Sequence, residues 1–278
     1  MSNHQISLLS YWITERVEIL RRRQAGATLP WSEDPIFQRH HFCNVHREDD
    51  RGTIDIAKVW RTPYREQANL PAIMGLARLF NWAPTLERIG DPYRDWRLEL
   101  DTLQKSGIKV FCSSYTVATT GAAVSKVYYV HGVWRALLRA NFYLTKDENY
   151  SISIDALYES ILRVKGFGSF MAAQVVADVK HARWSHLALD PVREFEFVAP
   201  GPGSLRGATK VLERKVTDGS FKYDLQQIRN ALVRLGNLHI SAIDNQDLQN
   251  CLCEFDKYTR YANHERGRVR RYKGEAAC

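Results

Sequence analysis

Apolar residues return every three or four positions in the first part of the chain, which is the period of a helix that buries one face. Between residues 5 and 25 these residues are Ile6, Leu9, Trp12, Ile13, Val17 and Leu20. Arginines occupy positions 21 to 23, at the end where a helix dipole favours cations. The pattern predicts an amphipathic helix with a basic C-terminal end, and capping explains these arginines better than DNA contact does.

Similar spacing predicts helices over much of the remaining chain. Residues 70–90 hold an apolar helix that breaks before Pro84, because a proline disfavours helical geometry in the residue before it. In residues 93–106 the side chains expected to face inward are Trp96, Leu98, Leu100 and Leu103. Further helices are expected at 132–143, 153–164, 222–236 and 244–262. Residues 110–130 mix β-branched with small residues, and the pattern leaves a short hairpin and a loop before a helix equally open.

The composition suits a mainly α protein that meets an anionic partner. The chain has 278 residues, of which 45% are hydrophobic, so it can bury a sizeable core as one large domain or two interlocked lobes. Lysine and arginine number 39 against 31 acidic residues, which gives a net charge of +8. A basic surface favours nucleic acid as the partner, although a simple role in solubility explains the charge equally well.

Cysteine usage and the apolar runs indicate the cellular setting. The five cysteines are odd in number and have no CxxC spacing, which favours a reducing compartment, the cytoplasm, over a disulfide framework. The first residues, MSNHQISLLSYW, lack the basic start of a signal peptide. The longest uncharged run, between Lys109 and Lys126, is too rich in Ser, Thr and Gly to predict a membrane span.

A turn with two glycines precedes an apolar helix. The segment Lys165-Gly166-Phe167-Gly168-Ser169 can turn tightly through positive φ values and expose backbone amides at a helix start. Such amides suit a DNA phosphate because they bind it without reading a base. Asp190 follows at the end of a short apolar run. Turns of this kind are also common at ordinary helix starts, and Asp190 is placed to cap a helix before Pro191.

Residues 28–61 concentrate polar side chains. Arg39 and Arg47 offer hydrogen-bond donors, Asn44 an amide and Asp50 an acceptor. Each of the two arginines can bind a phosphate with two hydrogen bonds. A surface ion-pair network, for instance Arg47 with Asp50, is the alternative. Possible metal ligands by type are His40, His41, Cys43 and His46. No second Cys/His pair follows at a zinc-like spacing, so no metal site is predicted.

Two later segments carry further candidate chemistry. The run PGPGSLRG, from Pro200 to Gly207, can receive an anion on its amides with Arg206, or simply cap a helix through Ser204. The chain has no GxxxxGK[ST] motif, which argues against a P-loop kinase or ATPase. Glu254 and Lys257 are neighbours on a helix, most simply a surface pair. The basic residues 264–278 predict a solvated tail or a phosphate contact.

Together these segments resemble the alpha-glutamyl/putrescinyl thymine pyrophosphorylase family of DNA-hypermodifying phages, also called amino acid:DNA transferases. The resemblance rests on FCNVHREDDRGT (42–53), VKGFGSFMAAQVVADV, LDPVREFEFVAPGPGSLRGA (189–208) and CLCEFDKYTRYANHERGRVRRY (251–272). It implies a mainly α, bilobal fold similar to the helix-hairpin-helix DNA glycosylases. A single domain would cover residues 1–278, with a hairpin lobe at roughly 100–215, a second lobe from the terminal segments and a basic tail at 264–278. A related helical domain is fused to the kinase that phosphorylates 5-hydroxymethyluracil in DNA, and the missing kinase motif favours the transferase.

The resemblance also implies roles for individual residues. Asp190 matches the position of the glycosylase catalytic aspartate, and Asn44 and Arg47 would join it in catalysis. The DNA-binding hairpin would be formed by Lys165, Gly166, Gly168 and Ser169. Pyrophosphate or substrate would be bound by Arg39, His46, Asp50, Arg193, Arg206, Glu254 and Lys257. The chain departs from glycosylases because it lacks the lysine of bifunctional enzymes after Gly168 and has no four-cysteine iron–sulfur signature.

The implied substrate is double-stranded DNA that carries 5-pyrophosphoryloxymethyl-uracil, with the base flipped into a pocket. An amine would replace the pyrophosphate, either an amino acid such as glycine or glutamate or the polyamine putrescine. Asp190 would deprotonate this amine or orient the base. No cofactor is required, although Mg²⁺ could accompany the pyrophosphate, and the protein is expected to be a monomer in the cytoplasm of the infected host. A DNA glycosylase and a non-catalytic helix-hairpin-helix DNA-binding protein are the alternatives.

Overall fold

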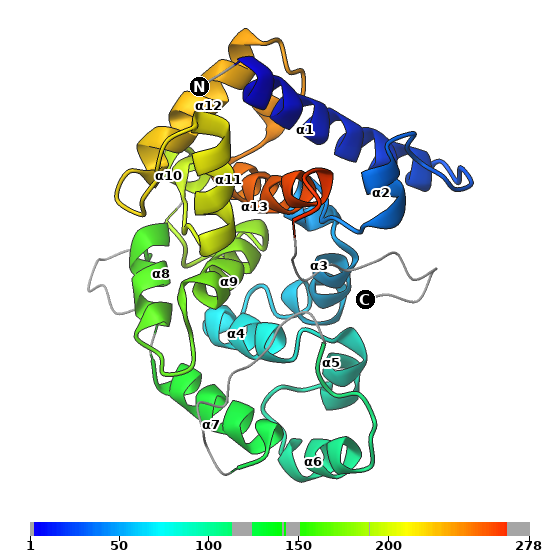
Figure 1. Cartoon of the computed structure of the whole chain (residues 1–278). Helices are drawn as coiled ribbons and strands as arrows, with labels where there is room; N and C mark the ends of the chain where they lie inside the picture. The colour runs from blue at the N-terminus through cyan, green and yellow to red at the C-terminus, as the bar shows by residue number, and fades with distance from the viewer. Residues whose placement is uncertain (1–2, 113–123, 141, 143–150, 189, 266–278) are drawn as a thin grey trace. The chain divides into compact units, whose positions relative to one another are not determined.

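The computed structural model describes residues 3–112, 124–140, 142, 151–188 and 190–265 (Figure 1). The basic tail expected at 264–278 therefore lies almost wholly outside the described residues, as does the middle of segment 110–130. The chain divides into two compact units. Unit 1 comprises Met1–Asp50 with Phe195–Ala277, and unit 2 comprises Arg51–Glu194. The hairpin thus belongs to a unit that begins well before the expected residue 100.

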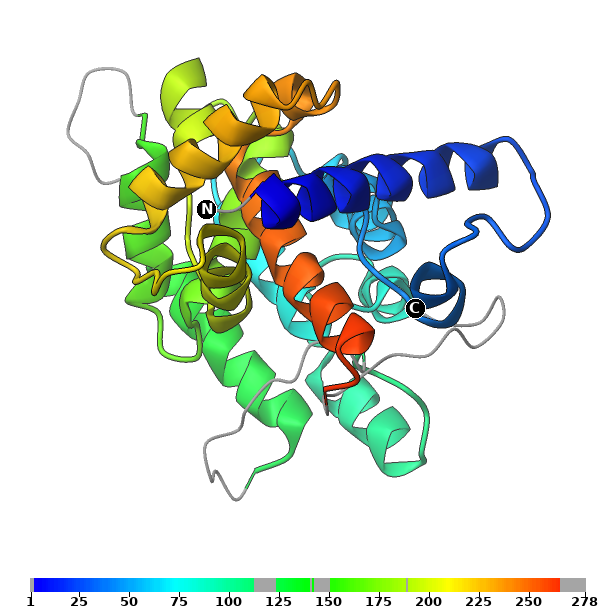
Figure 2. The ribbon, with the colours of Figure 1, turned by 45° about the horizontal axis from the view of Figure 1, so that its top comes forward.

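Unit 1 is built from the two terminal parts of the chain. Its helices are α1 (Asn3–Gln24), α2 (Pro35–Arg39), η1 (Arg47–Asp49), α11 (Pro202–Leu212), α12 (Phe221–Arg234), η3 (Ile240–Ala242) and α13 (Asn245–Ala262). In both views α13 lies beside α1 and α11 (Figure 1 and Figure 2), and α13 packs more closely on α11 than on any other helix of the unit. The short 3-10 helices η1 and η3 sit in the connections between the longer helices.

The core of unit 1 joins residues that are far apart in sequence. Trp12 of α1 packs on Phe37 and Phe42, and both of these phenyl rings contact Tyr258 of α13. On the other side of α13, a Cβ atom on Gly207 would overlap the backbone carbonyl of Leu252. Glycine is therefore required at 207, because the backbones of α11 and α13 touch there.

Unit 2 is a bundle around one fully buried helix. Its elements are α3 (Arg51–Ile56), the π-helical turn η2 (Ala57–Arg61), α4 (Leu70–Phe80), α5 (Ala83–Ile89), α6 (Arg97–Lys105), α7 (Lys126–Arg139), α8 (Ile154–Leu162) and α9 (Ser169–His181). The last helix, α10 (Pro191–Glu196), carries the chain across the boundary at Glu194. Every residue of α4 is buried, and α4 packs on α7 and α9.

A buried ion pair ties two helices of unit 2 together. Arg78 of α4 donates to both carboxylate oxygens of Asp178 of α9, at 2.6 Å and 2.7 Å, and Arg61 approaches the same carboxylate at 3.4 Å. The side chains of Arg78 and Asp178 are 3% and 1% exposed. Their charges are compatible with burial because each satisfies the other with two parallel hydrogen bonds.

The helical prediction is confirmed, with local differences. The described residues form helices and no strand, and isolated bridge residues occur at His40 and at Ile152, which pairs with Leu187. The first helix spans Asn3–Gln24 as expected, but its fully buried positions include Arg16 and Ile19, whereas Val17 and Leu20 are half-buried. Leu98 was expected to face inward and is 66% exposed, because Leu98 and the buried Leu100 lie roughly 200° apart around α6.

Helix ends follow the local signals. The apolar stretch at 70–90 breaks as expected before Pro84, where Asn81 ends α4 in the left-handed region. Ser153 caps α8 through its hydroxyl, which accepts the Ala156 N–H at 3.2 Å. Among the described residues, no helix combines the length and apolar character that crossing a membrane requires.

Candidate functional site

The segment that follows α2 runs between α1 and α13 and brings polar side chains together inside unit 1. The guanidinium of Arg16 donates to the side-chain oxygen of Asn44 at 2.6 Å and to the carbonyl of Cys43 at 3.1 Å. Asn44 is buried and its amide nitrogen donates to the carbonyl of Asp49 at 2.8 Å. Asn44 therefore fixes the loop that leads into η1, and a buried arginine fixes Asn44.

Arg47 and Asp50 form the next layer of this arrangement. Asp50 accepts the Asn44 N–H at 2.8 Å, and its other oxygen lies 3.6 Å from Nε of Arg47. Burial raises the pKa of Asp50, while Arg47 and the Asn44 N–H act in the opposite direction. Arg47 also donates to the side-chain oxygen of Asn250 on α13 at 3.2 Å. The Arg47–Asp50 pair that the sequence offered as an alternative is thus present.

Glu254 and Lys257 face the same loop from α13. Glu254 is 3% exposed, accepts the Cys43 N–H at 3.3 Å and pairs with Lys257. Burial is the largest single effect and opposes the charge on Lys257, but the charge and hydrogen bond of Glu254, with smaller effects of Cys43 and Cys253, together outweigh it and raise the pKa of Lys257. Burial likewise raises the pKa of the Cys43 thiol, which favours its neutral form. Glu254 and Lys257 are therefore part of an internal network and not merely a surface pair.

We refer to these side chains as the polar cluster, which comprises Arg16, Asn44, Arg47, Asp50, Asn250, Glu254 and Lys257. Its members come from α1, from the segment between Asn44 and Asp50 that contains η1, and from α13. Its charged members are three cations, Arg16, Arg47 and Lys257, and two carboxylates, Asp50 and Glu254. The side chains of Arg47 and Lys257 remain 15% and 37% exposed, so a ligand can reach the cations.

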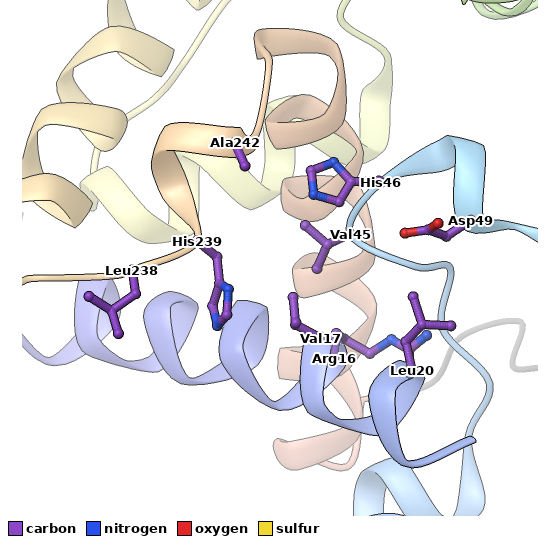
Figure 3. Close-up of a pocket in the computed structure, with 9 residues that line it drawn as sticks. All are labelled: Arg16, Val17, Leu20, Val45, His46, Asp49, Leu238, His239 and Ala242. Atoms are coloured by element: carbon purple, nitrogen blue, oxygen red, sulfur yellow. The ribbon is translucent and has the colours of Figure 1, made fainter. Parts of the chain in front are cut away.

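A cavity of about 140 Å³ lies beside the polar cluster (Figure 3). Its polar lining comprises Arg16, His46, Asp49 and His239, and its apolar lining comprises Val17, Leu20, Val45, Leu238 and Ala242. Nδ1 of His46 lies 2.9 Å from a carboxylate oxygen of Asp247, and this hydrogen bond raises the pKa of His46. The other oxygen of Asp247 accepts the Arg47 N–H at 3.1 Å. Burial raises the pKa of Asp49.

A second group of cations gathers on α11 and α13. The carboxylate of Asp256, 1% exposed, lies 3.0 Å from Nε of Arg206, 3.0 Å from Nζ of Lys210 and 3.4 Å from Arg260. One carboxylate cannot neutralise three cations, so this face keeps an excess of positive charge. Arg206 is 53% exposed and anchored by Asp256. Ser204 does not occupy the cap position itself, because its hydroxyl lies in the first turn of α11 and bonds back to Gly201.

The glycine turn joins α8 to α9 in unit 2. Gly166 has a φ of +106°, and a Cβ there would crowd Val133 of α7, so this position requires glycine. The positive φ expected at Gly168 is wrong, because its φ is −104° and it serves as the N-cap of α9. A Cβ at Gly168 would meet open space. Lys165 and Ser169 are exposed on either side, and the amides of the first turn of α9 begin here.

Asp190 caps the helix that follows it. Its Oδ1 accepts the N–H groups of Val192 and Arg193 at 3.0 Å and 3.1 Å, which is the capping role that the sequence left open. Asp190 and Arg193 are both exposed. Because both amides bind Oδ1, a substrate can still approach Oδ2.

The structure thus brings together six of the candidate residues within unit 1, namely Asn44, His46, Arg47, Asp50, Glu254 and Lys257. Arg39, at the end of α2, is exposed, and Arg206 belongs to the Asp256 group. Asp190, Arg193 and the glycine turn lie in unit 2. Among the described residues, no three or more His, Cys, Asp or Glu side chains are arranged to hold a metal ion.

Sequence reasoning did not find Arg16, Asp247 and Asn250. A signal for Arg16 existed, since this arginine falls three positions after Ile13 on the apolar face of α1. A charge at such a position needs a buried partner. Asp247 follows the N-cap Asp244 by three positions and donates its backbone N–H to it. That spacing marks a helix start and does not reveal that the carboxylate also holds His46.

Comparison with known proteins gives two matches. The family model described as "5-hmdU DNA kinase, helical domain" matches residues 3–268. A 5-hmdU DNA kinase of Bacillus phage SP10 is 25% identical over an alignment 286 residues long including gaps, and the alignment covers 92% of this chain and 45% of the kinase. The chain therefore spans less than half the length of the curated relative it matches. No solved structure matches the chain significantly.

Proposed function

Because the chain belongs to the family of 5-hmdU DNA kinase helical domains, we propose that it acts on 5-hydroxymethyluracil-derived bases in phage DNA. The reaction we propose is a transfer in which an amine displaces pyrophosphate from 5-pyrophosphoryloxymethyl-uracil. The amine is an amino acid such as glycine or glutamate, or putrescine. The phage origin of the matched kinase supports a DNA-modifying role inside an infected bacterium.

The observation that carries this proposal is the polar cluster of unit 1. A departing pyrophosphate takes several negative charges with it, and cations that are already in place stabilise that charge without reorganising. Arg47 and Lys257 are held by Asn250 and Glu254 and remain partly exposed. We assign the pyrophosphate to these two side chains, with Asp50 and Asn44 keeping Arg47 in position.

The proposed step balances in atoms and electrons. The bond between the exocyclic methylene carbon and the bridging oxygen breaks, and its electron pair leaves with the pyrophosphate. The amine nitrogen then forms a bond to that carbon and gives up one proton to a base on the protein. The products are the aminated base and pyrophosphate. The protein supplies charge stabilisation and a proton acceptor, both of which its own side chains can provide.

For DNA binding, we propose the turn between α8 and α9. The amides at the start of α9 and the ammonium of Lys165 suit a backbone phosphate. The open space at Gly168 supports this assignment, because a side chain there would stand where the phosphate approaches. Asp190, exposed and with Oδ2 accessible, remains our candidate for orienting the flipped base.

A second candidate function follows from the coverage of the match. Since the relative is a kinase and this chain aligns with 45% of it, the helical domain could serve recognition of modified DNA alone. Such a module would prefer duplexes containing 5-hydroxymethyluracil over thymine duplexes and would release no product. The polar cluster favours the transferase. Burying charged side chains costs desolvation free energy, and binding to the DNA backbone does not require it.

The experiment that tests the function mixes the protein with duplex DNA carrying the pyrophosphorylated base and a pool of glycine, glutamate and putrescine. Released pyrophosphate and the masses of the digested nucleosides are measured. We expect stoichiometric pyrophosphate and an aminated nucleoside, with Arg47→Gln at least tenfold slower and Arg21→Gln, exposed on α1, unchanged. Abasic sites would instead indicate a glycosylase, and binding without any product would indicate the recognition module.

A further inference from the structure

We propose that the cavity lined by Arg16, His46, Asp49 and His239 binds the free amine substrate, and that it takes a small α-amino acid in preference to a diamine. This inference rests on the proposed transfer to DNA, of which it names the second substrate. It also assigns the proton acceptor, His46, with Asp247 as the residue that positions it.

The charges around the cavity match both ends of a zwitterion. Arg16 is a buried cation whose two hydrogen bonds go to neutral acceptors, the Asn44 side chain and the Cys43 carbonyl. Burial lowers the pKa of Arg16, so an added carboxylate would relieve a charge that is costly to bury. Asp49 presents the opposite charge, and Figure 3 shows its carboxylate directed toward the enclosed space. A diamine has no group to place against Arg16.

The size of the cavity excludes the larger substrate. Its volume of about 140 Å³ is close to that of a roughly 150 Å³ cavity that holds one benzene-sized molecule. A flipped pyrimidine with its diphosphate is far larger than this, whereas an amino acid with a short side chain fits. The apolar side of the cavity, formed by Val17, Leu20 and Val45, would contact the aliphatic part of that amino acid.

His46 is arranged to accept the proton that the amine loses. Asp247 occupies Nδ1 at 2.9 Å, which leaves Nε2 to the substrate and orients the ring. Asp247 is itself fixed by the Arg47 N–H and by its place in the first turn of α13. The ammonium of the bound zwitterion first gives one proton to Nε2, which frees the lone pair that then forms the bond to the methylene carbon. Asp247 stabilises the imidazolium that results.

The test uses the full chain without DNA and measures binding of glycine, L-glutamate and putrescine by calorimetry. We expect glycine to bind, L-glutamate to bind more weakly because its side chain is longer, and putrescine to bind at least tenfold more weakly than glycine. Asp49→Asn should weaken amino acid binding at least tenfold. Ala242→Phe, at an exposed residue of η3 that lines the cavity, should abolish it by filling the space. Asp218→Asn, exposed and outside the lining, is the matched control and should bind as the parent does.

The outcomes separate this inference from the proposed function. No amino acid binding, equal binding by Ala242→Phe or preference for putrescine would overturn the inference, even if DNA is aminated. Amino acid binding with the expected variant pattern would support the site, even if no pyrophosphate is ever released. Melting curves of both variants establish that a loss of binding is not a loss of folding.

Discussion

The carboxylate of Asp247 lies 2.9 Å from Nδ1 of His46, although 201 positions separate the two residues. Asp247 also accepts the Arg47 N–H, so one aspartate at the start of α13 organises the N-cap and the first residue of η1. The hydrogen bond from Asp247 raises the pKa of His46, against the effect of burial. The charged imidazole is therefore stabilised in the folded protein.

This contact predicts a pH dependence of stability. Because the folded pKa of His46 lies above its ordinary value of about 6.5, its stabilisation is complete below that pH and is lost as the pH rises through the folded pKa. The difference in unfolding free energy between the parent and His46→Gln should thus be largest below about pH 6.5 and shrink as the pH rises through the folded pKa of His46. Urea unfolding at several pH values measures it, and a difference that grows with pH would contradict the assignment.

The buried pair of Arg78 and Asp178 predicts a large loss of stability. Asp178→Asn leaves the guanidinium of Arg78 buried without its counter-charge, which costs about 3–5 kcal/mol of unfolding free energy. The control is Glu159→Gln, which breaks a pair with Arg163 whose side chains are 66% and 79% exposed. That change should cost less than about 1 kcal/mol. Denaturant titration compares the two, and equal effects would mean that burial does not decide the outcome.

The contact between α11 and α13 predicts that Gly207 cannot be replaced. In Gly207→Ala the new Cβ would meet the carbonyl of Leu252, which is backbone and cannot move aside. We expect the unfolding free energy to fall by about 1–3 kcal/mol or more. Gly219→Ala, where a Cβ meets open space, should be neutral or slightly stabilising. Thermal melts of the two variants distinguish the positions, and a stable Gly207→Ala protein would require the helices to lie farther apart.

The turn between α8 and α9 predicts a salt-dependent DNA contact. Lys165→Gln should weaken duplex binding at low salt and reduce the slope of log K against log salt by about 0.9, since one phosphate contact is lost. The effect should not depend on base sequence, because a backbone contact reads none. Fluorescence anisotropy measures the slope. Lys215→Gln, exposed in unit 1, is the comparison, and an identical slope for both variants would remove the turn from the DNA interface.

Asp190 has a capping role that can be separated from chemistry. Asparagine caps helices about as well as aspartate, so Asp190→Asn should preserve stability, whereas Asp190→Ala should cost about 1 kcal/mol. If the carboxylate orients the flipped base, Asp190→Asn keeps its DNA affinity and loses turnover. Pyrophosphate release by the two variants, with their melting temperatures, tests this. Full activity of Asp190→Asn would leave the cap as the only role of the residue.

The helices were predictable because their signals are local. The spacing of Ile6, Leu9 and Trp12 repeats within each turn of α1, and Pro84 marks a break that depends on its immediate neighbour. Ser153 was likewise recognisable as a cap from the residues that follow it. Leu98 was misjudged because residues two positions apart, such as Leu98 and the buried Leu100, face opposite sides of a helix. These features involve residues within a few positions of one another.

The candidate site was only partly predictable. The loop containing Asn44, Arg47 and Asp50 drew notice through the density of its polar residues, and Glu254 and Lys257 through their spacing. In the sequence, the Arg47–Asp50 and Glu254–Lys257 pairs lie on separate segments, and each could be interpreted as a surface ion pair. Only the folded unit shows that the buried carboxylate of Glu254 accepts the Cys43 N–H and also pairs with Lys257.

From its sequence alone, then, this protein was determined to be helical, basic and rich in polar residues near Asn44. The tertiary structure decided that Arg16 is buried, that Asp247 holds His46, and that Arg16 and His46 both line a cavity of about 140 Å³. Helical periodicity depends on residues one turn apart in the sequence. The contacts of Arg16, His46 and Asp247, in contrast, join α1, a loop and α13 from opposite ends of the chain. Such pairings arise only when chain closure and packing bring those segments together, and no local pattern encodes them.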